Sequence, residues 1–422
     1  MKSIQKIQAG ALQFVLFIGA IIAILLFSFV LVSYSHNLFR KKTDILVQVI
    51  QATDFGLTAS FAKGMRLGET MAVPFSDDLN ITTVTRKSYW GILEMRHTKA
   101  TKEQLAFEKW AFVGTASKEG HALYLQDNQR PLVLAGKTKI TGDAHLPEQG
   151  VKMGNIYGHS YYAPQLIYGE EKRSSAQLPL FHRELGQQME KWTSHTNEPE
   201  GEPLLYENGM VAKNSFKAPV KVIKGSHISL GKVELSGNII VWATEKIEVG
   251  AFTKLHDILL VAPEIEIANW TKGNLQALAS RSISVGKGCE LAYPSVLLVH
   301  QKNQTLSEIP ENSPNITIDA YATVRGMVIY CGDNGAANVV TPQIHINGNA
   351  KVVGEVFCAG NLELKGRVNG SVTTGAFVAL ENGNVYQNHL YNGSIDRTVL
   401  PEEYAGLTYG NAPVNQVLKW LY

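Results

Sequence analysis

Aliphatic and polar residues alternate in a short unit that recurs along the second half of the chain. Each unit is a triplet in which two aliphatic residues flank one polar or charged residue. The triplets are Ile228-Ser229-Leu230, Ile247-Glu248-Val249, Ile265-Glu266-Ile267, Ile283-Ser284-Val285, Ile316-Thr317-Ile318, Ile344-His345-Ile346 and Leu362-Glu363-Leu364. The first four begin 19, 18 and 18 residues apart, and the last two are again 18 apart. A constant step of this kind indicates a repeat architecture.

The step predicts a β-solenoid over residues 216–396. In such a fold each turn lays short strands on the turn before, about 4.8 Å apart. The aliphatic residues point inward and the middle residue points outward, and several turns must stack to bury a core. Glycines after the triplets, such as Gly250 and Gly286, permit the corners. A β-sandwich is the alternative, but it predicts alternation with two-residue turns instead of a constant translation.

The N-terminal region follows a different pattern, because no charged residue lies between Lys6 and Arg40. Residues 11–33 are almost wholly apolar, and these 23 residues make a helix of roughly 34 Å, enough to cross a membrane core of about 30 Å. A cleavable signal peptide has a shorter apolar run and a small-residue cleavage site. A buried core helix would carry polar interruptions. The pattern therefore predicts one uncleaved transmembrane helix, and apolar spacing near the helical period extends it outward through residues 44–66.

The remaining segments complete an expected fold that is mainly β, with a single N-terminal transmembrane helix, an α/β membrane-proximal segment and a C-terminal β-solenoid (β-helix). The expected domains are a tail and span at 1–43, a membrane-proximal segment at 44–215, the solenoid at 216–396 and a cap or docking tail at 397–422. Short strands are expected at 81–85, 89–93, 109–113, 122–125, 132–134 and 139–144, and an amphipathic helix at 181–192. A polar stretch with two prolines at 194–203 predicts a linker.

Composition narrows the function. The 422 residues include 39 Lys+Arg and 37 Asp+Glu, for a net charge of +2, which argues against nucleic acid as the main partner. Three cysteines, Cys289, Cys331 and Cys358, exclude a disulfide scaffold and a four-cysteine zinc site. The 12 histidines are scattered without a metal-binding motif. The sequence therefore predicts neither a metal site nor a cofactor.

Catalytic chemistry has only weak candidates. A carbohydrate-active β-helix enzyme needs paired carboxylates on one face, and Asp319, Asp333 and Glu355 are the residues that could supply them. The middle residues of the triplets are expected to align, so Glu248 and Glu266 should form an acidic stripe, which Glu363 could continue. A solvated outer face explains these acids more simply than catalysis does.

One stretch of the repeat resembles a known family. Val353-Gly354-Glu355-Val356 and Gly366-Arg367-Val368-Asn369-Gly370-Ser371-Val372 are similar to the repeated Gly-x-Val rungs of bactofilins, which are polymer-forming cytoskeletal β-helix proteins. The resemblance implies a β-helix and, for that family, filaments made by end-to-end stacking, in some members attached to membranes. This chain departs from the family in its transmembrane span, in its large preceding segment and in insertions near 300–315 and 331–343.

The N-terminus resembles type IV minor pilins. The stretch Gln8-Ala9-Gly10-Ala11-Leu12-Gln13-Phe14 is similar to their short polar leader, which ends in Gly before a long apolar helix. Those proteins often have Glu five residues after the Gly, where this chain has Val15. The resemblance implies a peptidase site at Gly10 and a body that faces outward, whereas a plain signal anchor implies neither.

These observations predict a single-pass, non-catalytic structural or scaffold protein of the bacterial envelope. It would bind protein partners or self-associate, as a pilus-like or polymer-forming assembly component. The alternative is a membrane-anchored β-helix polysaccharide lyase or glycoside hydrolase. Basic residues on the two sides of the span are nearly balanced, which leaves the orientation open, and export of the C-terminal body to the periplasmic side is the expectation.

Overall fold

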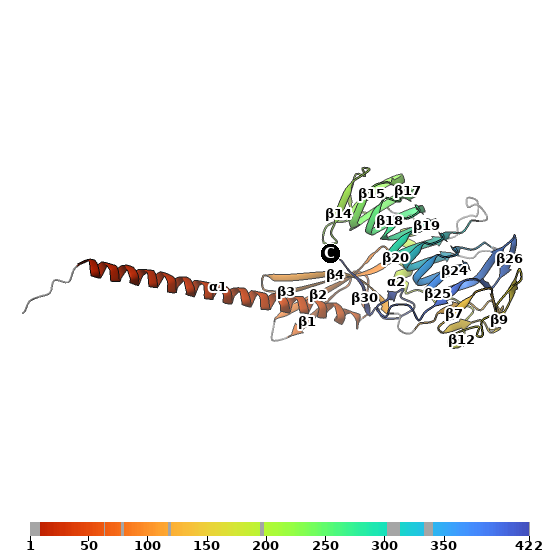
Figure 1. The fold of residues 1–422 in the computed structure, drawn as a ribbon, viewed down its shortest axis with the longest axis horizontal. Coiled ribbons are helices and arrows are strands. Elements are labelled where there is room, and N and C mark those ends of the chain that lie inside the picture. The colour runs from red at the N-terminus through yellow and green to blue at the C-terminus, as the bar shows by residue number, and fades with distance from the viewer. Residues whose placement is uncertain are drawn as a thin grey trace, which may run out of the picture. The chain divides into compact units, whose positions relative to one another are not determined.

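The computed structural model describes residues 9–62, 64–76, 80–116, 120–194, 198–301, 313–332 and 341–421 (Figure 1). Over these residues the chain is mainly β, with one long apolar N-terminal helix. It divides into two compact units. The first comprises residues 1–59, 71–85 and 98–108, and the second comprises residues 60–70, 86–97 and 109–422.

The N-terminal helix α1 spans Ala9–Phe61. Its most apolar 18-residue window has a mean hydropathy of 3.1 and is wholly exposed, so in length and composition the helix can span a membrane. The helix continues past the expected span, as the apolar spacing predicts. Within the first unit, Val49 and Ala52 of this continuation are buried against Ile81 and Ala100. Gly56 has no room for a side chain there, because an added Cβ would lie 2.8 Å from the side chain of Thr83.

A six-stranded sheet follows α1, with the order β1-β2-β3-β4-β29 and with β30 also paired to β4. Its strands are β1 (Thr70–Ser76), β2 (Ile81–Trp90), β3 (Leu93–Lys102), β4 (Leu105–Ala116), β29 (Ala405–Gly406) and β30 (Gln416–Leu421). The expected strand at 89–93 is wrong, because Gly91 adopts a φ of 59° and turns the chain from β2 into β3. The C-terminal run, for which a cap over the last turn was one expectation, instead pairs antiparallel with β4.

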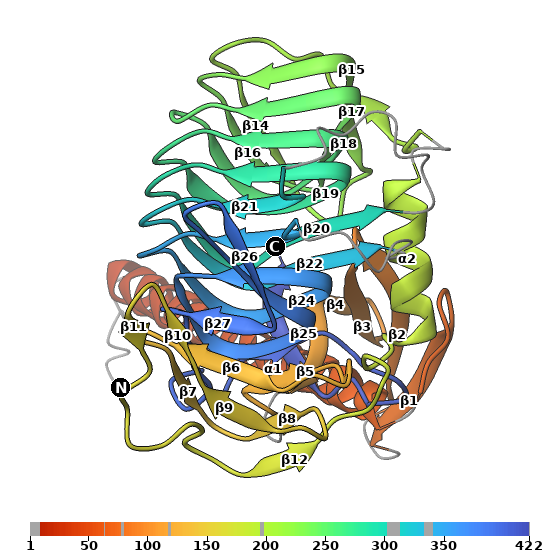
Figure 2. The same cartoon turned by 90° about the vertical axis from the view of Figure 1, so that its right-hand side faces the viewer.

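The second unit contains a closed, barrel-like parallel sheet. Its long strands are β15 (Lys221–Leu230), β17 (Ile239–Val249), β18 (Lys254–Ile267), β19 (Lys272–Val285), β20 (Glu290–Gln301), β22 (Thr323–Gly332), β24 (Lys351–Leu364) and β25 (Arg367–Glu381), and shorter ones include β14 (Val211–Asn214), β16 (Glu234–Gly237), β21 (Ile316–Ile318) and β23 (Ile344–Ile346). The seven triplets pair in order: Ile228 with Ile247, then Ile265, Ile283, Ile316, Ile344 and Leu362. The sequence periodicity therefore predicts the register correctly. Figure 2 shows these strands as successive layers.

The sheet also includes residues from the expected membrane-proximal segment. These strands are β5 (Leu123–Leu125), β7 (Lys139–Thr141), β8 (Ala144–Leu146) and β12 (Glu171–Arg173). β6 (Leu132–Ala135) and β9 (Val151–Met153) form a separate three-stranded sheet with β27 (His389–Tyr391). β5 pairs in parallel with β25, β7 with β28 (Ser394–Asp396), and β6 with β27. The layer at 122–141 thus stacks directly on the last layer of the repeat, which comes about 250 residues later in the chain.

Between β12 and the repeat, the chain forms the helix α2 (Arg183–Thr193), as the amphipathic pattern at 181–192 predicts. Figure 2 shows α2 beside the layered strands, and it contacts β18, β19 and β20. The chain then reaches the opposite end of the sheet, where β13 (Glu202–Pro203) pairs with β15. The expected linker at 194–203 falls in this connection, although residues 195–197 lie outside the described part of the chain.

The interior of the closed sheet is filled by the inward aliphatic residues of the triplets and of the other strands. Cys289 and Cys358 belong to this core as small buried residues, whereas Cys331 packs in a second cluster outside the sheet. At one corner, Gly326, Gly354 and Gly370 lie in register on successive layers. A Cβ on Gly354 would lie 2.0 Å from the carbonyl oxygen of Gly326, and its φ of 140° excludes other residues without strain.

Candidate functional site

The middle strands of the repeat are apolar on both sides. Val241, Leu260, Val328 and Val356 belong to the interior core. The residues before and after them in each strand point to the opposite face and form two outward columns. One column consists of Ile240, Leu259, Gln276, Val296, Met327, Glu355 and Ser371, and the other of Trp242, Val261, Leu278, Leu298, Ile329, Phe357 and Thr373. Near-continuous apolar strands are typical of a parallel sheet that is covered on both faces.

Several elements of the second unit cover these outward columns. Leu185 and Met189 of α2, Trp90 and Ile92 near the β2–β3 turn, and Leu407 near β29 are buried in the same cluster as the column residues. Gln276 interrupts the column and fixes this cover, because its side chain accepts a hydrogen bond from the Ile92 N–H and donates one to the Trp90 carbonyl. The covered face is therefore a second hydrophobic core of the unit.

Glu355 lies in this covered column between Met327 and Ser371. One of its oxygens accepts a hydrogen bond of 3.0 Å from the backbone N–H of Leu407. Burial raises the pKa of Glu355 to about 7, although the Leu407 N–H and the charge of Arg397 act to lower it. Gly406 passes so close that an added Cβ would lie 2.1 Å from the carboxylate. Glu355 is thus sealed beneath the C-terminal segment and is not open to a substrate.

Two tyrosines tie this C-terminal segment to the sheet. The Tyr293 hydroxyl donates a hydrogen bond of 2.7 Å to the carbonyl of Ala405. The Tyr404 hydroxyl donates one of 3.1 Å to the carbonyl of Gly326, at the glycine corner. Burial raises the pKa values of both tyrosines, so they stay protonated and act as donors at neutral pH. Their role is to hold the segment in place.

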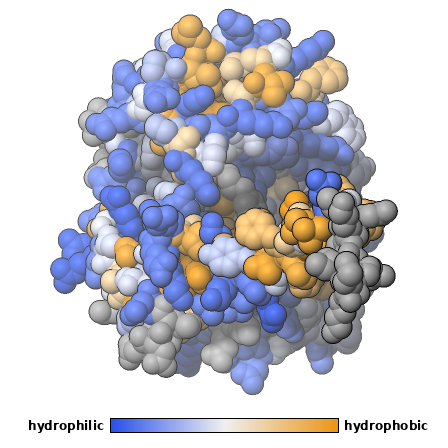
Figure 3. All heavy atoms as spheres, turned by 90° about the vertical axis from the view of Figure 1, so that its left-hand side faces the viewer, coloured by the Kyte–Doolittle hydropathy of each residue, from blue (hydrophilic) through white to orange (hydrophobic). Residues whose placement is uncertain are grey.

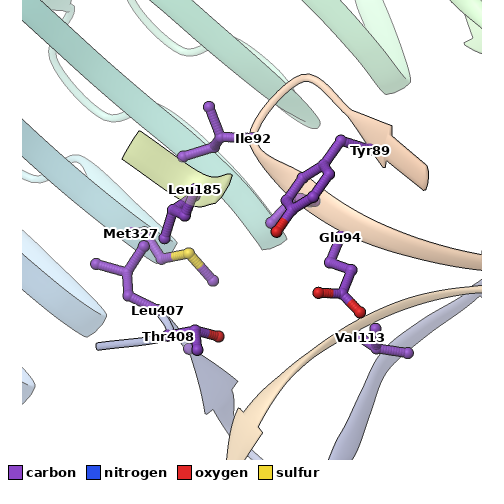
Figure 4. Close-up of a pocket in the computed structure, with 10 residues that line it drawn as sticks. Tyr89, Ile92, Glu94, Val113, Leu185, Met327, Leu407 and Thr408 are labelled. Atoms are coloured by element: carbon purple, nitrogen blue, oxygen red, sulfur yellow. The ribbon is translucent and has the colours of Figure 1, made fainter. Parts of the chain in front are cut away.

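A small cavity lies beside this segment, lined by side chains from β2, β3, β4, α2, β22 and β29. Figure 4 shows the polar groups of Tyr89 and Glu94 on one side, and Leu185, Met327 and Leu407 on the other. The cavity measures about 20 Å³, which is room for one water molecule. Small-molecule sites are larger by an order of magnitude, so this space does not fit a substrate.

Next to the cavity lies a buried ionic network that the sequence pattern does not predict. The Lys87 Nζ atom lies 2.6 Å from Glu184 and 3.2 Å from Glu94, and it donates a hydrogen bond to the Met65 carbonyl. Arg96 holds the other side of Glu94 at 2.6 Å. Burial and the Glu94 charge raise the pKa of Tyr89, which faces the same network. The network has donors and carboxylates in balance, and it joins α2 to β2 and β3 as a structural element.

The other sequence candidates do not converge with Glu355. Asp319 lies at the corner between β21 and β22, where its carboxylate accepts hydrogen bonds from the Ala320 N–H and from the side chain of Asn347. Asp333 lies outside the described residues, as does most of the insertions at 300–315 and 331–343. Asp319 is thus on a corner and Glu355 on the covered face, so the described candidates are not paired across a groove.

The acidic stripe is present as the spacing predicts. Glu248 and Glu266 are in register, and Lys246 bridges them at 2.8 and 2.7 Å. Both acids are partly exposed to solvent. Farther along the same column, Glu363 is buried and accepts a hydrogen bond of 2.6 Å from His345. Although burial acts against it, the hydrogen bond from His345 and the charge of Lys365 keep the pKa of Glu363 low. These groups form ion pairs along an outer face.

The described residues contain no group of three or more His, Cys, Asp or Glu side chains placed to hold a metal ion. No protein-family model matches the chain, and no curated protein or solved structure is significantly similar to it. The resemblances to bactofilins and to minor pilins therefore stay predictions.

Proposed function

We propose that this chain is a membrane-anchored, non-catalytic structural protein of the bacterial envelope. The observation that carries the proposal is that a membrane-length apolar helix is joined to a body in which the best-placed carboxylate, Glu355, is sealed beneath the C-terminal segment. A chain built in this way places a rigid surface near a membrane. Its work is to position and bind partners and not to turn over a substrate.

The body is a β-solenoid in this proposal. Support comes from the register of the triplets, in which each strand pairs in parallel with its counterpart in a neighbouring layer. Further support comes from the aligned corner glycines, which leave room for one layer to approach the next. A stack of this kind resists bending because every layer is hydrogen-bonded along its length.

The two ends of the sheet oppose end-to-end stacking of one chain on another. β12 consists of Glu171, Lys172 and Arg173, all exposed, and charged side chains protect an edge from pairing with another chain. At the other extreme, Pro203 in β13 lacks a backbone donor. Leu205 and Val211 are exposed near that end, and Figure 3 shows hydrophobic surface at the top of the view, where β14 and β15 lie in Figure 1. This apolar surface supports contact with a protein partner.

The carbohydrate-active alternative has less support, because Asp319 and Glu355 occupy different faces. Its decisive assay is glycan cleavage by the full chain and by an Asp319→Asn/Glu355→Gln variant. Cleavage that the double substitution abolishes would replace the structural proposal with the enzymatic one.

Export of the body to the periplasmic side is part of this proposal, and a measurement of membrane topology tests it. Alkaline phosphatase, which is active only after export, is fused after Tyr422, and a matched fusion carries a fluorescent protein that folds only in the cytoplasm. We expect an active phosphatase and a dark fluorescent fusion, in cells whose membrane fraction retains the chain. A fluorescent fusion with inactive phosphatase would assign the body to the cytoplasm and would overturn the export part of the proposal.

A further inference from the structure

One corner of the parallel sheet carries a line of exposed aromatic residues. On successive layers the triplet strand is followed by a four-residue corner, at residues 250–253, 268–271, 286–289, 319–322 and 347–350. The third position of these corners holds Phe252, Trp270, Gly288, Tyr321 and Asn349. Phe252, Trp270 and Tyr321 are 77%, 61% and 57% exposed, so the corner forms an aromatic ladder along the stack.

The backbone at this corner would be easier to build without the rings. Trp270 and Tyr321 have φ values of 64° and 63°, in the left-handed region that bulky residues avoid. Gly288 and Asn349, at the same position of other layers, are the residue types that suit it, with φ values of 68° and 63°. Large aromatic side chains placed there stay more than half exposed, so they recover little burial in return. Burial in the core therefore does not explain why this corner carries rings.

The rings are held in place by their neighbours. The Lys232 ammonium lies over the Phe252 ring at 5.9 Å, and the Lys287 ammonium lies over the Tyr321 ring at 5.5 Å. The Trp270 indole covers Gly288 so closely that an added Cβ would lie 2.3 Å from it. The absence of a side chain at Gly288 thus makes room for the indole. These contacts restrain each of the three rings at this corner of the stack.

The strand that follows each corner adds polar groups beside the rings. Glu234, Lys254, Lys272 and Glu290 lie in register on four successive layers, directly after the corner. Lys254 lies 3.5 Å from Glu234, and Lys272 lies 3.1 Å from Glu290. Lys254, Lys272 and Glu290 are largely exposed, whereas Glu234 is partly buried. The column therefore offers two neighbouring lysine donors flanked by two carboxylate acceptors, and these four groups carry no net charge.

From this juxtaposition we propose that the ladder binds a linear polysaccharide lying along the stack. Layers repeat at about 4.8 Å, so a ligand that touches all three rings must be an extended polymer with a flat apolar face in each unit. The C–H faces of pyranose rings stack on aromatic side chains, while their hydroxyl edges accept from lysine and donate to glutamate. A single-stranded nucleic acid needs a continuous positively charged track for its phosphates, and here Glu234 and Glu290 neutralise two of the four lysines beside the rings.

The proposal goes beyond the structural role proposed above and does not depend on membrane orientation or on self-association. Native affinity electrophoresis of the detergent-solubilised full chain tests it, in gels containing hydroxyethylcellulose, glycol chitin, polygalacturonate or poly(dT). The test variant is Trp270→Asn/Tyr321→Asn, because Asn349 shows that asparagine suits this corner. The control is Tyr162→Asn, which removes an aromatic residue that is 72% exposed elsewhere in the chain.

We expect at least one of the three polysaccharides to retard the wild-type chain and the control. The double variant should bind about tenfold or more weakly, the loss expected for two ring contacts. An unchanged melting temperature of the double variant shows that the fold is intact. The proposal is overturned if no polysaccharide retards the wild-type chain, if the folded double variant is retarded equally, or if poly(dT) retards the chain most strongly.

Discussion

The carboxylate of Glu355 accepts a 3.0 Å hydrogen bond from the backbone N–H of Leu407, which joins the last strand-forming segment of the chain to the face of β24. This contact places a titratable group with a pKa raised to about 7 inside the second hydrophobic core. The attachment of the C-terminal segment is therefore linked to protonation. It gives the first testable prediction.

Stability falls as pH rises from 4.5, the ordinary pKa of this carboxyl, to about 7. In that window the unfolded chain has released the Glu355 proton and the folded chain keeps it, so the unfolded state binds fewer protons. A rise in pH across the window therefore lowers the free energy of unfolding by roughly 3 kcal/mol. Glu355→Gln removes this titration. Relative to wild type, its free energy of unfolding should rise between about pH 5 and about pH 8. Urea unfolding at a series of pH values measures this free energy. The control is Glu290→Gln, which removes an exposed carboxylate. If the free energy of unfolding responds to pH equally in the two variants, the prediction is wrong.

Lys87→Met should destabilise the second unit by about 3–5 kcal/mol, because it leaves the buried carboxylates of Glu94 and Glu184 without their shared cation. Adding Glu184→Gln should recover part of the loss, and a double-mutant cycle in urea measures the coupling. The control is Lys272→Met, which breaks a solvent-exposed pair and should cost about 1 kcal/mol or less. Equal losses in Lys87→Met and Lys272→Met would show that the network is not needed for stability.

Gly354→Ala should destabilise the sheet by about 3 kcal/mol or more, since the new methyl group meets the Gly326 carbonyl and the φ of 140° disfavours alanine. Gly348→Ala is the matched control. It lies on the same layer and nothing is within 4 Å of an added Cβ. Thermal melting of the two variants should differ clearly, and similar melting temperatures would argue against the close approach of layers at this corner.

Ile22→Arg should weaken membrane insertion of α1 by about 2.5–3.5 kcal/mol, the cost of an arginine at the centre of a span, and should lower the share of the chain that resists extraction. Asn37→Arg adds the same charge beyond the expected span at 11–33 and should leave the chain in the membrane fraction. Carbonate extraction followed by sedimentation measures both variants. Retention of Ile22→Arg to the same extent as Asn37→Arg would oppose the assignment of this part of α1 to the bilayer.

Periodicity in the sequence predicts the repeat well. Most of the triplets begin 18 or 19 residues apart and all share one burial requirement, so the pattern predicts their register from Ile228 to Leu362. The apolar helix is equally predictable from the sequence, because its length and its lack of charged residues are local properties. By contrast, the pattern does not predict the turn at Gly91, since Tyr89, Trp90, Ile92 and Leu93 have strand-like composition on both sides of it.

The site was less predictable, for a physical reason. Glu355 is one of the sequence candidates, yet its environment depends on Leu407, more than 50 residues away. The network around Lys87 joins residues from three separate stretches of the chain. In the sequence, each of its charged residues resembles an ordinary exposed one. One signal was available for the covered face. Some middle strands, such as residues 258–262, are apolar at every position, which indicates burial on both sides.

The pairing of β5 with β25 has a consequence for biosynthesis. The layer at 122–141 emerges from the ribosome early, but the strands that cover its edge are translated about 250 residues later. Until then this layer exposes unpaired backbone groups of the kind that recruit chaperones or nucleate aggregation. The long loop closure also predicts slow, late completion of folding. A chain truncated before β25 would lack the strand that pairs with β5. Proteolysis of such truncated products would then leave only full-length chains.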